Sequence, residues 1–212
     1  MTEDIRVCFI GDSFVNGTGD DTALGWVGRV CAVARARGVG LTAYNLGIRR
    51  DTSLDVLARC EQEWSRRLPA GVDRRLVLSF GVNDTYIEDG AADTRVTMAA
   101  SCDAFRRIAA AATAATATAA TATATGSASR VLFVGPPPVA DDDHNARVER
   151  LAAALFGEAI RCGVPHIDLF TPLVADEGYR REIASGDGAH PNAAGYARIA
   201  EQVMASPVWW FR

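Results

Sequence analysis

The sequence predicts an α/β fold, a three-layer α/β/α sandwich with helices on both faces of a central five-stranded parallel sheet. Short apolar runs alternate with longer segments whose apolar residues recur at helical spacing. The strand candidates are apolar on both faces, as expected for parallel strands buried between helices. Right-handed crossovers between such strands distribute the helices over both faces of the sheet.

The first half of the chain supplies two strand-helix pairs. The run IRVCFI predicts a strand at 5–10, and LGWVGRVCAVARARG predicts the helix that follows at 24–38. LTAYNLG predicts a second strand at 41–47. The next helical segment, 53–68, ends before Pro69, because proline disfavours helix in the residue that precedes it.

The second half repeats this alternation. RLVLSFG predicts a strand at 75–81, followed by a helix over at least 94–112. RVLFVG predicts a fourth strand at 130–135, and a helix follows at about 144–162. The last two predicted elements are a strand at 164–170 and a helix at 191–204. We expect the whole chain, 1–212, to form a single domain.

The segment 109–125 contains only alanine and threonine. It lacks the stripe of large apolar residues that a partner-binding or membrane-surface helix would carry. We therefore predict that 109–128 is a flexible insertion, a helix end that leads into a loop with poor order near 116–128.

Charge and composition exclude several classes of protein. The net charge is −4, whereas nucleic-acid binders usually present a basic face. All 22 basic residues are arginine, which excludes lysine Schiff-base chemistry and the lysine of a P-loop. No window approaches the ~20 apolar residues of a membrane span. The N-terminal apolar stretch is too short for a signal peptide.

The five cysteines are scattered and never form a C-x-x-C pair, as in proteins of a reducing compartment. We expect them to be unpaired and the protein to be cytoplasmic, unless a leader precedes this chain.

The stretch VCFIGDSFVNGTGD, residues 7–20, leaves a strand through a glycine-rich turn. Such a turn can cradle a phosphate or present a nucleophile. The glycines at 11, 17 and 19 do not match G-x-G-x-x-G, and no acidic residue ends the second strand to bind a ribose. The nucleophile interpretation, with Ser13, is therefore favoured.

A serine nucleophile needs a base and an orienting carboxylate, and the chain has three histidines. His166 lies in a predicted strand and is expected to be a packed side chain. His144 follows three aspartates at a helix start, where a solvated cap is expected. His190 follows Asp187 by three residues and precedes Pro191, which suits a first helical position. A capped loop without chemistry is the alternative for this segment.

Four short blocks resemble those of the GDSL esterases and lipases, also called SGNH hydrolases. They are GDS at 11–13, YNLGIRRDTS at 44–53, FGVNDT at 80–85 and DGAHP at 187–191. They occur in the family's order, each at a predicted strand end or at the start of the last helix. The resemblance spans roughly 5–204 and implies an SGNH-hydrolase or flavodoxin-like sandwich.

The resemblance also implies the roles of individual residues. Ser13 would be the nucleophile, His190 the base and Asp187 its orienting carboxylate. The backbone N–H groups of Ser13 and Gly47 and the side-chain amide of Asn83 would form the oxyanion hole. The first block reads G-D-S-F where the family has G-D-S-L, which we expect to change packing rather than chemistry.

Other residues near the predicted strand ends are expected to support the site. Asp12 and Asp84 would hydrogen-bond to the backbone of their turns. Residues that could shape the substrate pocket are Phe14, Tyr86, Ile87, Pro137 and Val139. The C-terminal aromatics Trp209, Trp210 and Phe211 would pack back on the domain or form a homo-oligomer contact.

These observations predict a serine esterase that acts on a small or medium acyl ester without metal or cofactor. An acyltransferase or thioesterase with the same site is an alternative, and acyl length, leaving group and acceptor stay open. Two other classes are less favoured. A metal-dependent phosphoesterase would want more imidazoles than this chain supplies. A non-catalytic carbohydrate- or acyl-binding module would be expected to lack Ser13, Asn83 or His190.

Overall fold

The computed structural model describes residues 4–117 and 129–212. The strands are β1 (Ile5–Gly11), β2 (Leu41–Gly47), β3 (Asp73–Ser79), β4 (Val131–Val134) and β5 (His166–Ile167). The longer helices are α2 (Gly25–Ala36), α3 (Ser53–Ser65), α4 (Met98–Thr116), α6 (Asp142–Arg161) and α9 (Ala193–Ala205). The shorter ones are α1 (Ser13–Asn16), η1 (Asn83–Thr85), α7 (Phe170–Val174) and α8 (Glu177–Ser185).

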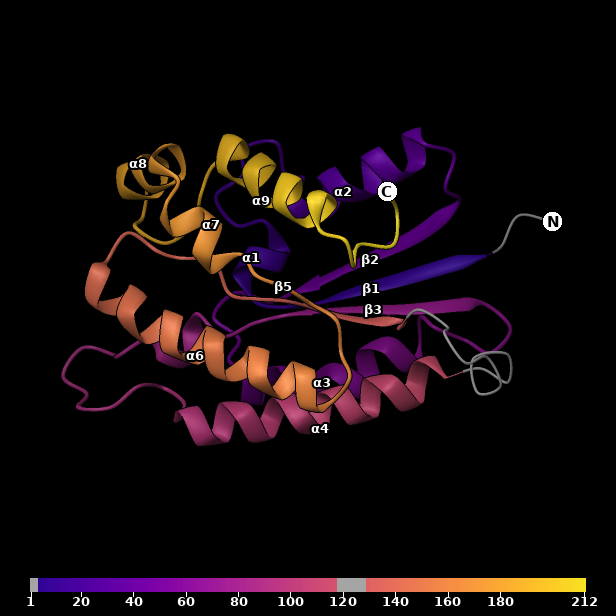
Figure 1. The fold of residues 1–212 in the computed structure, drawn as a ribbon, viewed down its shortest axis with the longest axis horizontal. Helices are drawn as coiled ribbons and strands as arrows, with labels where there is room; N and C mark the ends of the chain where they lie inside the picture. Colours follow the sequence, from indigo (N-terminus) through magenta and orange to yellow (C-terminus); the bar gives the residue numbers. More distant parts are fainter. Residues whose placement is uncertain (1–3, 118–128) are drawn as a thin grey trace.

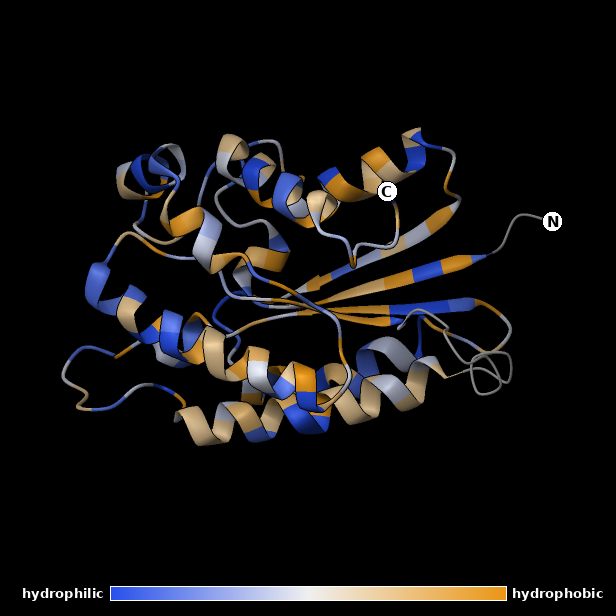
Figure 2. Cartoon of the chain, in the orientation of Figure 1, coloured by the Kyte–Doolittle hydropathy of each residue, from blue (hydrophilic) through white to orange (hydrophobic). Residues whose placement is uncertain are grey.

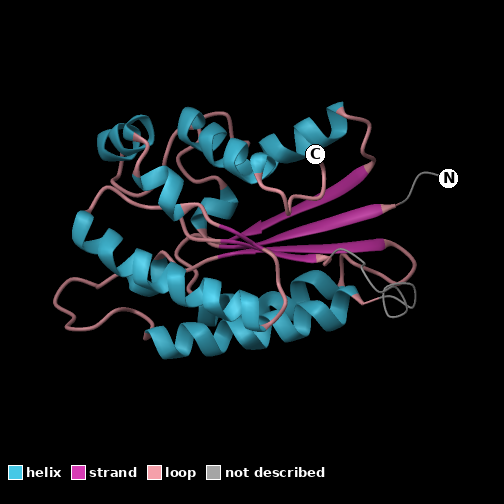
Figure 3. Cartoon of the chain, viewed as in Figure 1, coloured by secondary structure: helices cyan, strands magenta, loops and turns pink. Residues whose placement is uncertain are grey.

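The strands form one parallel five-stranded sheet in the order β2-β1-β3-β4-β5. Helices α2 and α9 cover one face together with the short helices α1, α7 and α8 (Figure 1). Helices α3, α4 and α6 cover the other face (Figures 1 and 3). The predicted three-layer α/β sandwich is confirmed.

The central strand β1 explains why the sheet has a hydrophobic core on each side. Val7 and Phe9 pack with α2 and α9, while Cys8 and Ile10 pack with α3, α4 and α6. All four side chains are fully buried, and the middle strands carry much of the hydrophobic colour in Figure 2. Alternate side chains of a strand point to opposite faces, so a strand covered on both faces must be apolar throughout.

The five cysteines are unpaired, as predicted.

The register of the sheet brings three strand ends level. Gly11 at the end of β1 pairs with Gly47 of β2 on one side and with Ser79 of β3 on the other. The segments that follow these residues therefore leave the same edge of the sheet side by side. Sites in open α/β sheets form at this carboxyl edge.

The sequence-based boundaries differ at the start of α4 and at the β5 edge. The helix predicted from 94 begins at Met98, behind the capping side chain of Thr97. The predicted strand 164–170 contributes only His166–Ile167 to the sheet, and its remaining residues are loop and the first turn of α7. The helices α7 and α8 were not predicted. α8 begins behind Asp176, whose side chain accepts a hydrogen bond from the N–H of Tyr179.

The Ala/Thr-rich segment is helical in its first part. α4 continues to Thr116, and Ala109 and Ala112 are buried in the core that this helix forms with the sheet. Residues 109–116 of the predicted flexible insertion are therefore helical, and their first turn packs in the core. Residues 118–128 of this prediction lie outside the described residues.

The aromatic C-terminus packs back on its own domain. Trp209 and Phe211 are buried in the core beside α2 and α9. The Arg75 guanidinium lies 4.9 Å from the Phe211 ring centroid and 5.4 Å from that of Trp210. Among the described residues, no helix combines the length and apolar character needed to cross a membrane.

Candidate active site

Ser13 is the first residue of α1, directly beyond the end of β1. The side chain of Asp12 caps this helix by accepting the N–H of Phe14 at 2.9 Å. A side chain at Gly11 would overlap the carbonyl oxygen of Ser79, so only glycine fits where β1 ends beside β3. The turn thus buries most of Ser13 but holds its hydroxyl at the carboxyl edge of the sheet.

Ser13, His190 and Asp187 form a continuous hydrogen-bonded chain. Nε2 of His190 lies 2.7 Å from Oγ of Ser13, and Nδ1 lies 2.7 Å from the carboxylate of Asp187. The Phe14 ring packs beside the imidazole at a centroid distance of 5.3 Å. The structure therefore brings together the three residues that the sequence predicts to react.

Asp187 is fixed by more than the imidazole. Its Oδ1 accepts the backbone N–H of Ala189 at 3.0 Å and that of His190 at 2.8 Å. Burial raises the pKa of Asp187, but the hydrogen bonds from His190 and Ala189 outweigh it and lower this pKa to about 2. The carboxylate is therefore ionised at neutral pH.

Two contacts hold the histidine loop against the serine turn. The hydroxyl of Tyr196, on α9, donates to the carbonyl of Thr18 at 2.7 Å. Gly19, with φ of 89°, lies so close to His190 and Pro191 that a side chain would meet both. The prediction that Pro191 is the first helical residue is wrong, because α9 begins at Ala193 behind the cap Asn192.

Asn83 reaches the same cavity from the loop after β3. Its side-chain amide donates one hydrogen bond to the carbonyl of Asp51 at 3.0 Å. An amide nitrogen has two N–H groups, so the second can serve a ligand. The N–H of Ser13 is also available, because the first residues of a helix have no intrahelical acceptor.

Gly47 does not lie where the sequence predicts. Its N–H donates to Oδ1 of Asn45 at 3.1 Å, and its α-carbon packs against Asn16 of α1. Gly47 is still in β2 and does not line the cavity at Ser13. The predicted oxyanion role of Gly47 is therefore not supported.

The cavity is instead lined by Arg49 and Arg50, beyond the end of β2. Arg50 has a φ of 68°, a left-handed conformation uncommon for residues other than glycine. None of the described residues offers a hydrogen-bond acceptor to its N–H. Sequence reasoning missed Arg50, and its residue type gives no sign of this conformation.

Two buried aspartates brace these turns. Asp12 bonds to the backbone of its own turn, as the sequence predicts, whereas Asp84 bonds to groups outside its turn. Asp84 accepts the backbone N–H of Ser53 at 2.7 Å and the hydroxyl of Ser101 at 2.6 Å. Burial raises the pKa of Asp84. Burial, reinforced by the nearby carboxylates of Asp84 and Asp51, raises the pKa of Asp12 to about 7.

His144 is not the solvated cap that the sequence predicts. It is buried, and its Nε2 lies 3.0 Å from Oγ1 of Thr85 and 3.2 Å from the carbonyl of Val82. The packing of α6 against η1 causes this burial, which lowers the pKa of His144. The capping side chain is that of Asp141.

The cavity at Ser13 has a volume of about 410 Å³ and opens to solvent. Of the predicted pocket residues, Phe14, Tyr86 and Val139 line it. Ile87 and Pro137 are not among the described residues that do so.

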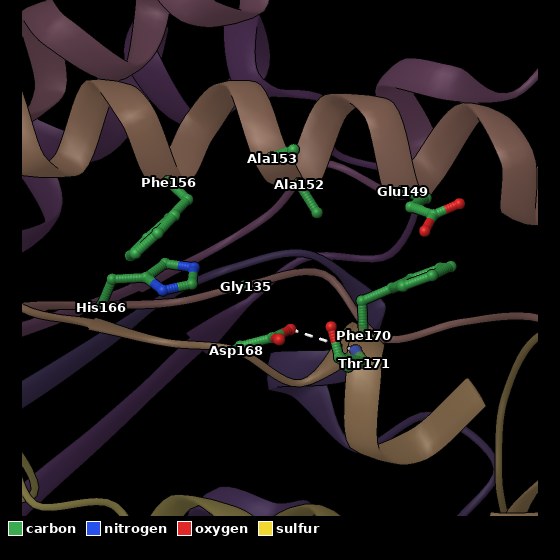
Figure 4. A pocket seen from close by; sticks show the side chains of 9 residues that line it. All are labelled: Gly135, Glu149, Ala152, Ala153, Phe156, His166, Asp168, Phe170 and Thr171. Carbon is green, nitrogen blue, oxygen red and sulfur yellow. Dashed lines mark hydrogen bonds between the residues drawn. The ribbon is translucent and has the colours of Figure 1, made fainter. Parts of the chain in front are cut away.

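A second hollow of about 300 Å³ lies between α6 and the segment after β5 (Figure 4). The rings of Phe156 and His166 face each other there, with centroids 4.6 Å apart. Burial lowers the pKa of His166 to about 4, so this imidazole is neutral at pH 7. The prediction that His166 is a packed side chain is confirmed, because its ring packs against Phe133 and Phe156. This hollow shares no lining residue with the cavity at Ser13.

Known proteins resemble this chain in sequence pattern and fold. The model of the GDSL-like Lipase/Acylhydrolase family matches residues 9–198. A lipase/acylhydrolase from Enterococcus faecalis superposes with a TM-score of 0.71 at 21% identity, over 94% of this chain and 93% of that one. TesA superposes with a TM-score of 0.71 at 22% identity, over 96% and 99%.

Axe2, an acetylxylan esterase from Geobacillus stearothermophilus, matches over 100% of both chains with a TM-score of 0.71 at 17% identity. A comparison with curated protein sequences gives no match. The family match favours the esterase interpretation over a metal-dependent phosphoesterase or a non-catalytic module. Because the family model covers most of its length, the chain belongs to the GDSL-like lipase/acylhydrolase family and is a serine ester hydrolase.

Proposed function

We propose that Ser13, His190 and Asp187 are the catalytic triad of an esterase that hydrolyses small or medium acyl esters. The observation that carries this proposal is the pair of 2.7 Å contacts that links the serine hydroxyl, the imidazole and the carboxylate. A serine hydroxyl becomes nucleophilic when such a base takes its proton.

The reaction follows from these contacts. Oγ of Ser13 bonds to the ester carbonyl carbon while its proton passes to Nε2 of His190. Asp187 holds Nδ1–H and stabilises the imidazolium. The bond to the alcohol then breaks, and the alcohol leaves with the proton from His190. Water, deprotonated by the same imidazole, then attacks the carbonyl carbon of the acyl-serine. The bond from this carbon to Oγ breaks, Oγ takes the proton back from His190, and the acid is released. These steps use only side chains and water, so we propose no metal or cofactor.

We further propose that the carbonyl oxygen is held by three donors as it becomes negative. They are the N–H of Ser13, the amide of Asn83 and the N–H of Arg50, which replaces Gly47 in this role. Arg50 is supported by its left-handed backbone, its free N–H and its place in the cavity. One such donor typically contributes about 3–4 kcal/mol to transition-state stabilisation.

The test is the turnover of p-nitrophenyl acetate by the wild type and by Ser13→Ala. The variant should lose at least 10³-fold in kcat, as triad variants of other serine hydrolases do. Ser65→Ala, which removes an exposed hydroxyl at the end of α3, is the matched control and should keep full activity. Unchanged circular dichroism shows that each variant is folded. An active Ser13→Ala would refute the proposed nucleophile.

A substrate panel tests the acyl length. A series of p-nitrophenyl esters from acetate to decanoate should be cleaved fastest at its short end, and a preference for decanoate would overturn that expectation. Acetylated sugars belong in the panel because Axe2 is an acetylxylan esterase. An added alcohol acceptor separates hydrolysis from acyl transfer.

A further inference from the structure

The cavity at Ser13 has two walls of opposite charge. Three arginines line it, Arg49, Arg50 and Arg95, and two aspartates, Asp141 and Asp187. The arginines come from the segment after β2 and from the approach to α4. The aspartates come from the cap of α6 and from the loop before α9.

The arginine wall is built from two loops that bind each other. Arg95 donates from Nη1 to the carbonyl of Arg50 at 2.8 Å. The next residue, Asp51, accepts the amide of Asn83 at 3.0 Å. The cations therefore lie on the same side of the cavity as the proposed oxyanion donors.

The aspartate wall is a separate unit whose carboxylates are already engaged. Ala140 donates its N–H to the carbonyl of Gly188 at 2.8 Å, which joins the two loops of this wall. Asp141 accepts the N–H of His144, and Asp187 accepts three hydrogen bonds from its own loop.

The arginine wall holds one arginine without an ion pair among the described residues. Its other two arginines, Arg50 and Arg95, both pair with Glu88, at 2.7 and 3.5 Å, and the carboxylates of Asp51, Asp55 and Asp84 also attract Arg95. Within residues 4–117 and 129–212, no carboxylate lies within ion-pair distance of Arg49. Asp89 and Asp93, in the same loop as Glu88, form no ion pair with a described arginine and do not line the cavity.

The ion pair between Arg50 and Glu88 on this wall can be exchanged for a ligand. The side chains of Arg50 and Glu88 are 68% and 47% exposed. Ion pairs this exposed stabilise a protein little, because water and salt screen them. An incoming anion can therefore bind Arg49 and compete with Glu88 for Arg50 without a large cost.

We infer that the natural substrate carries a negatively charged group that Arg49 binds while the scissile ester lies at Ser13. This inference rests on the proposed function and specifies its substrate class. A guanidinium presents parallel N–H donors that fit the two oxygens of a carboxylate, phosphate or sulfate. The charge can lie on the acyl or on the alcohol side of the ester, and the test has an arm for each.

The experiment compares kcat/KM for esters that differ in one charge. On the acyl side the pair is mono-4-nitrophenyl adipate and its methyl ester. On the alcohol side the pair is 4-acetoxybenzoate and methyl 4-acetoxybenzoate. We expect a preference of about 10- to 100-fold for the anion in at least one pair, the range of a hydrogen bond to a charged group. Added salt should reduce this preference.

Variants assign the preference to Arg49. Arg49→Gln should reduce the ratio of kcat/KM between anionic and neutral ester toward one, and Arg49→Lys should retain part of it. The ratio cancels any general loss of activity. Arg66→Gln is the matched control, because Arg66 is exposed at the far end of α3. This control should leave the ratio at its wild-type value.

The outcomes separate the two proposals. If the wild type cleaves neutral esters but prefers the anion in neither pair, the inference about the substrate charge is overturned while the esterase proposal stands. A preference that survives in Arg49→Gln likewise refutes the role of Arg49. If Ser13→Ala cleaves esters as well as the wild type, the proposed function itself fails.

Discussion

The carboxylate of Asp84 accepts the backbone N–H of Ser53 at 2.7 Å, and Asp84 is fully buried. This bond joins the loop after β3 to the first residue of α3. The adjacent Asn83 donates to the carbonyl of Asp51, in the segment that leads into α3. Asn83 and Asp84, in the loop after β3, therefore fix the position of the segment between β2 and α3.

Asp84→Ala should destabilise the protein and weaken catalysis together. The substitution leaves the N–H of Ser53 and the hydroxyl of Ser101 without their acceptor. Each unsatisfied buried group costs about 1–3 kcal/mol, so we expect the free energy of unfolding to fall by about 2–4 kcal/mol. Urea denaturation measures this. Asp89→Ala, on an exposed loop, is the control and should change stability by less than ~0.5 kcal/mol. Equal stability of the two variants would contradict the bracing role.

Asp187→Asn should reduce kcat by about 10⁴-fold, as the equivalent change does in a serine protease triad. The amide cannot hold the imidazole in the correct tautomer. Stability should change little, because the Asp187 side chain is 53% exposed. Steady-state kinetics and a thermal melt measure the two effects. A kcat within tenfold of the wild type would argue against Asp187 as the orienting group.

The pH profile of kcat/KM should show an acid limb with a slope of one. The pKa of Asp187 is lowered to about 2, so this carboxylate stays charged above pH 4 and adds no second proton to the limb. A slope of two above pH 4 would show that the carboxylate of Asp187 also gains a proton in this range.

Asn83→Ala should lower kcat about 10²- to 10³-fold with little change in KM, because an oxyanion donor acts mainly in the transition state. The loss of the bond to Asp51 affects stability, which a thermal melt reports separately. A variant that changed KM alone would place Asn83 in substrate binding instead.

Asp12→Asn should change how stability depends on pH. The pKa of Asp12 is about 7 in the folded protein, against ~3.9 for an unfolded aspartate. Between these values the folded state holds a proton that the unfolded state has lost, so the contribution of Asp12 to stability falls as pH rises from about 4 to about 7. The stability of the variant relative to wild type should rise over this window by ~2–4 kcal/mol and then stay level. Urea denaturation at pH 4, 7 and 8 tests this, and a constant difference would contradict it.

Most of the fold could be predicted because its strands are short apolar runs. β1 and β2 lie where IRVCFI and LTAYNLG place them. The strand predicted at 164–170 is longer than β5, because most of its apolar residues do not pair with β4. The chain enters the sheet only beside β4 and turns directly into α7. α7 and α8 are too short to show a helical period in the sequence.

The candidate site also has some features that the sequence could predict and others that it could not. The spacing of Asp187 and His190 is local, so sequence alone could suggest that they pair. The meeting of Ser13 and His190 is a tertiary contact that only the family resemblance implied. The choice between Gly47 and Arg50 depends on the backbone path beyond β2, and a φ of 68° at an arginine has no signature in sequence. The burial of His144 likewise comes from distant packing against Thr85 and Val82.

The serine and the histidine that touch at Nε2 and Oγ are 177 positions apart in the chain. The proposed nucleophile and its proposed base are therefore contributed by opposite ends of the described chain, one just beyond β1 and the other just before α9. A backbone cut anywhere between them would separate the two groups covalently, so ester cleavage by such a nicked protein would depend on the two fragments staying associated through the sheet and its helices.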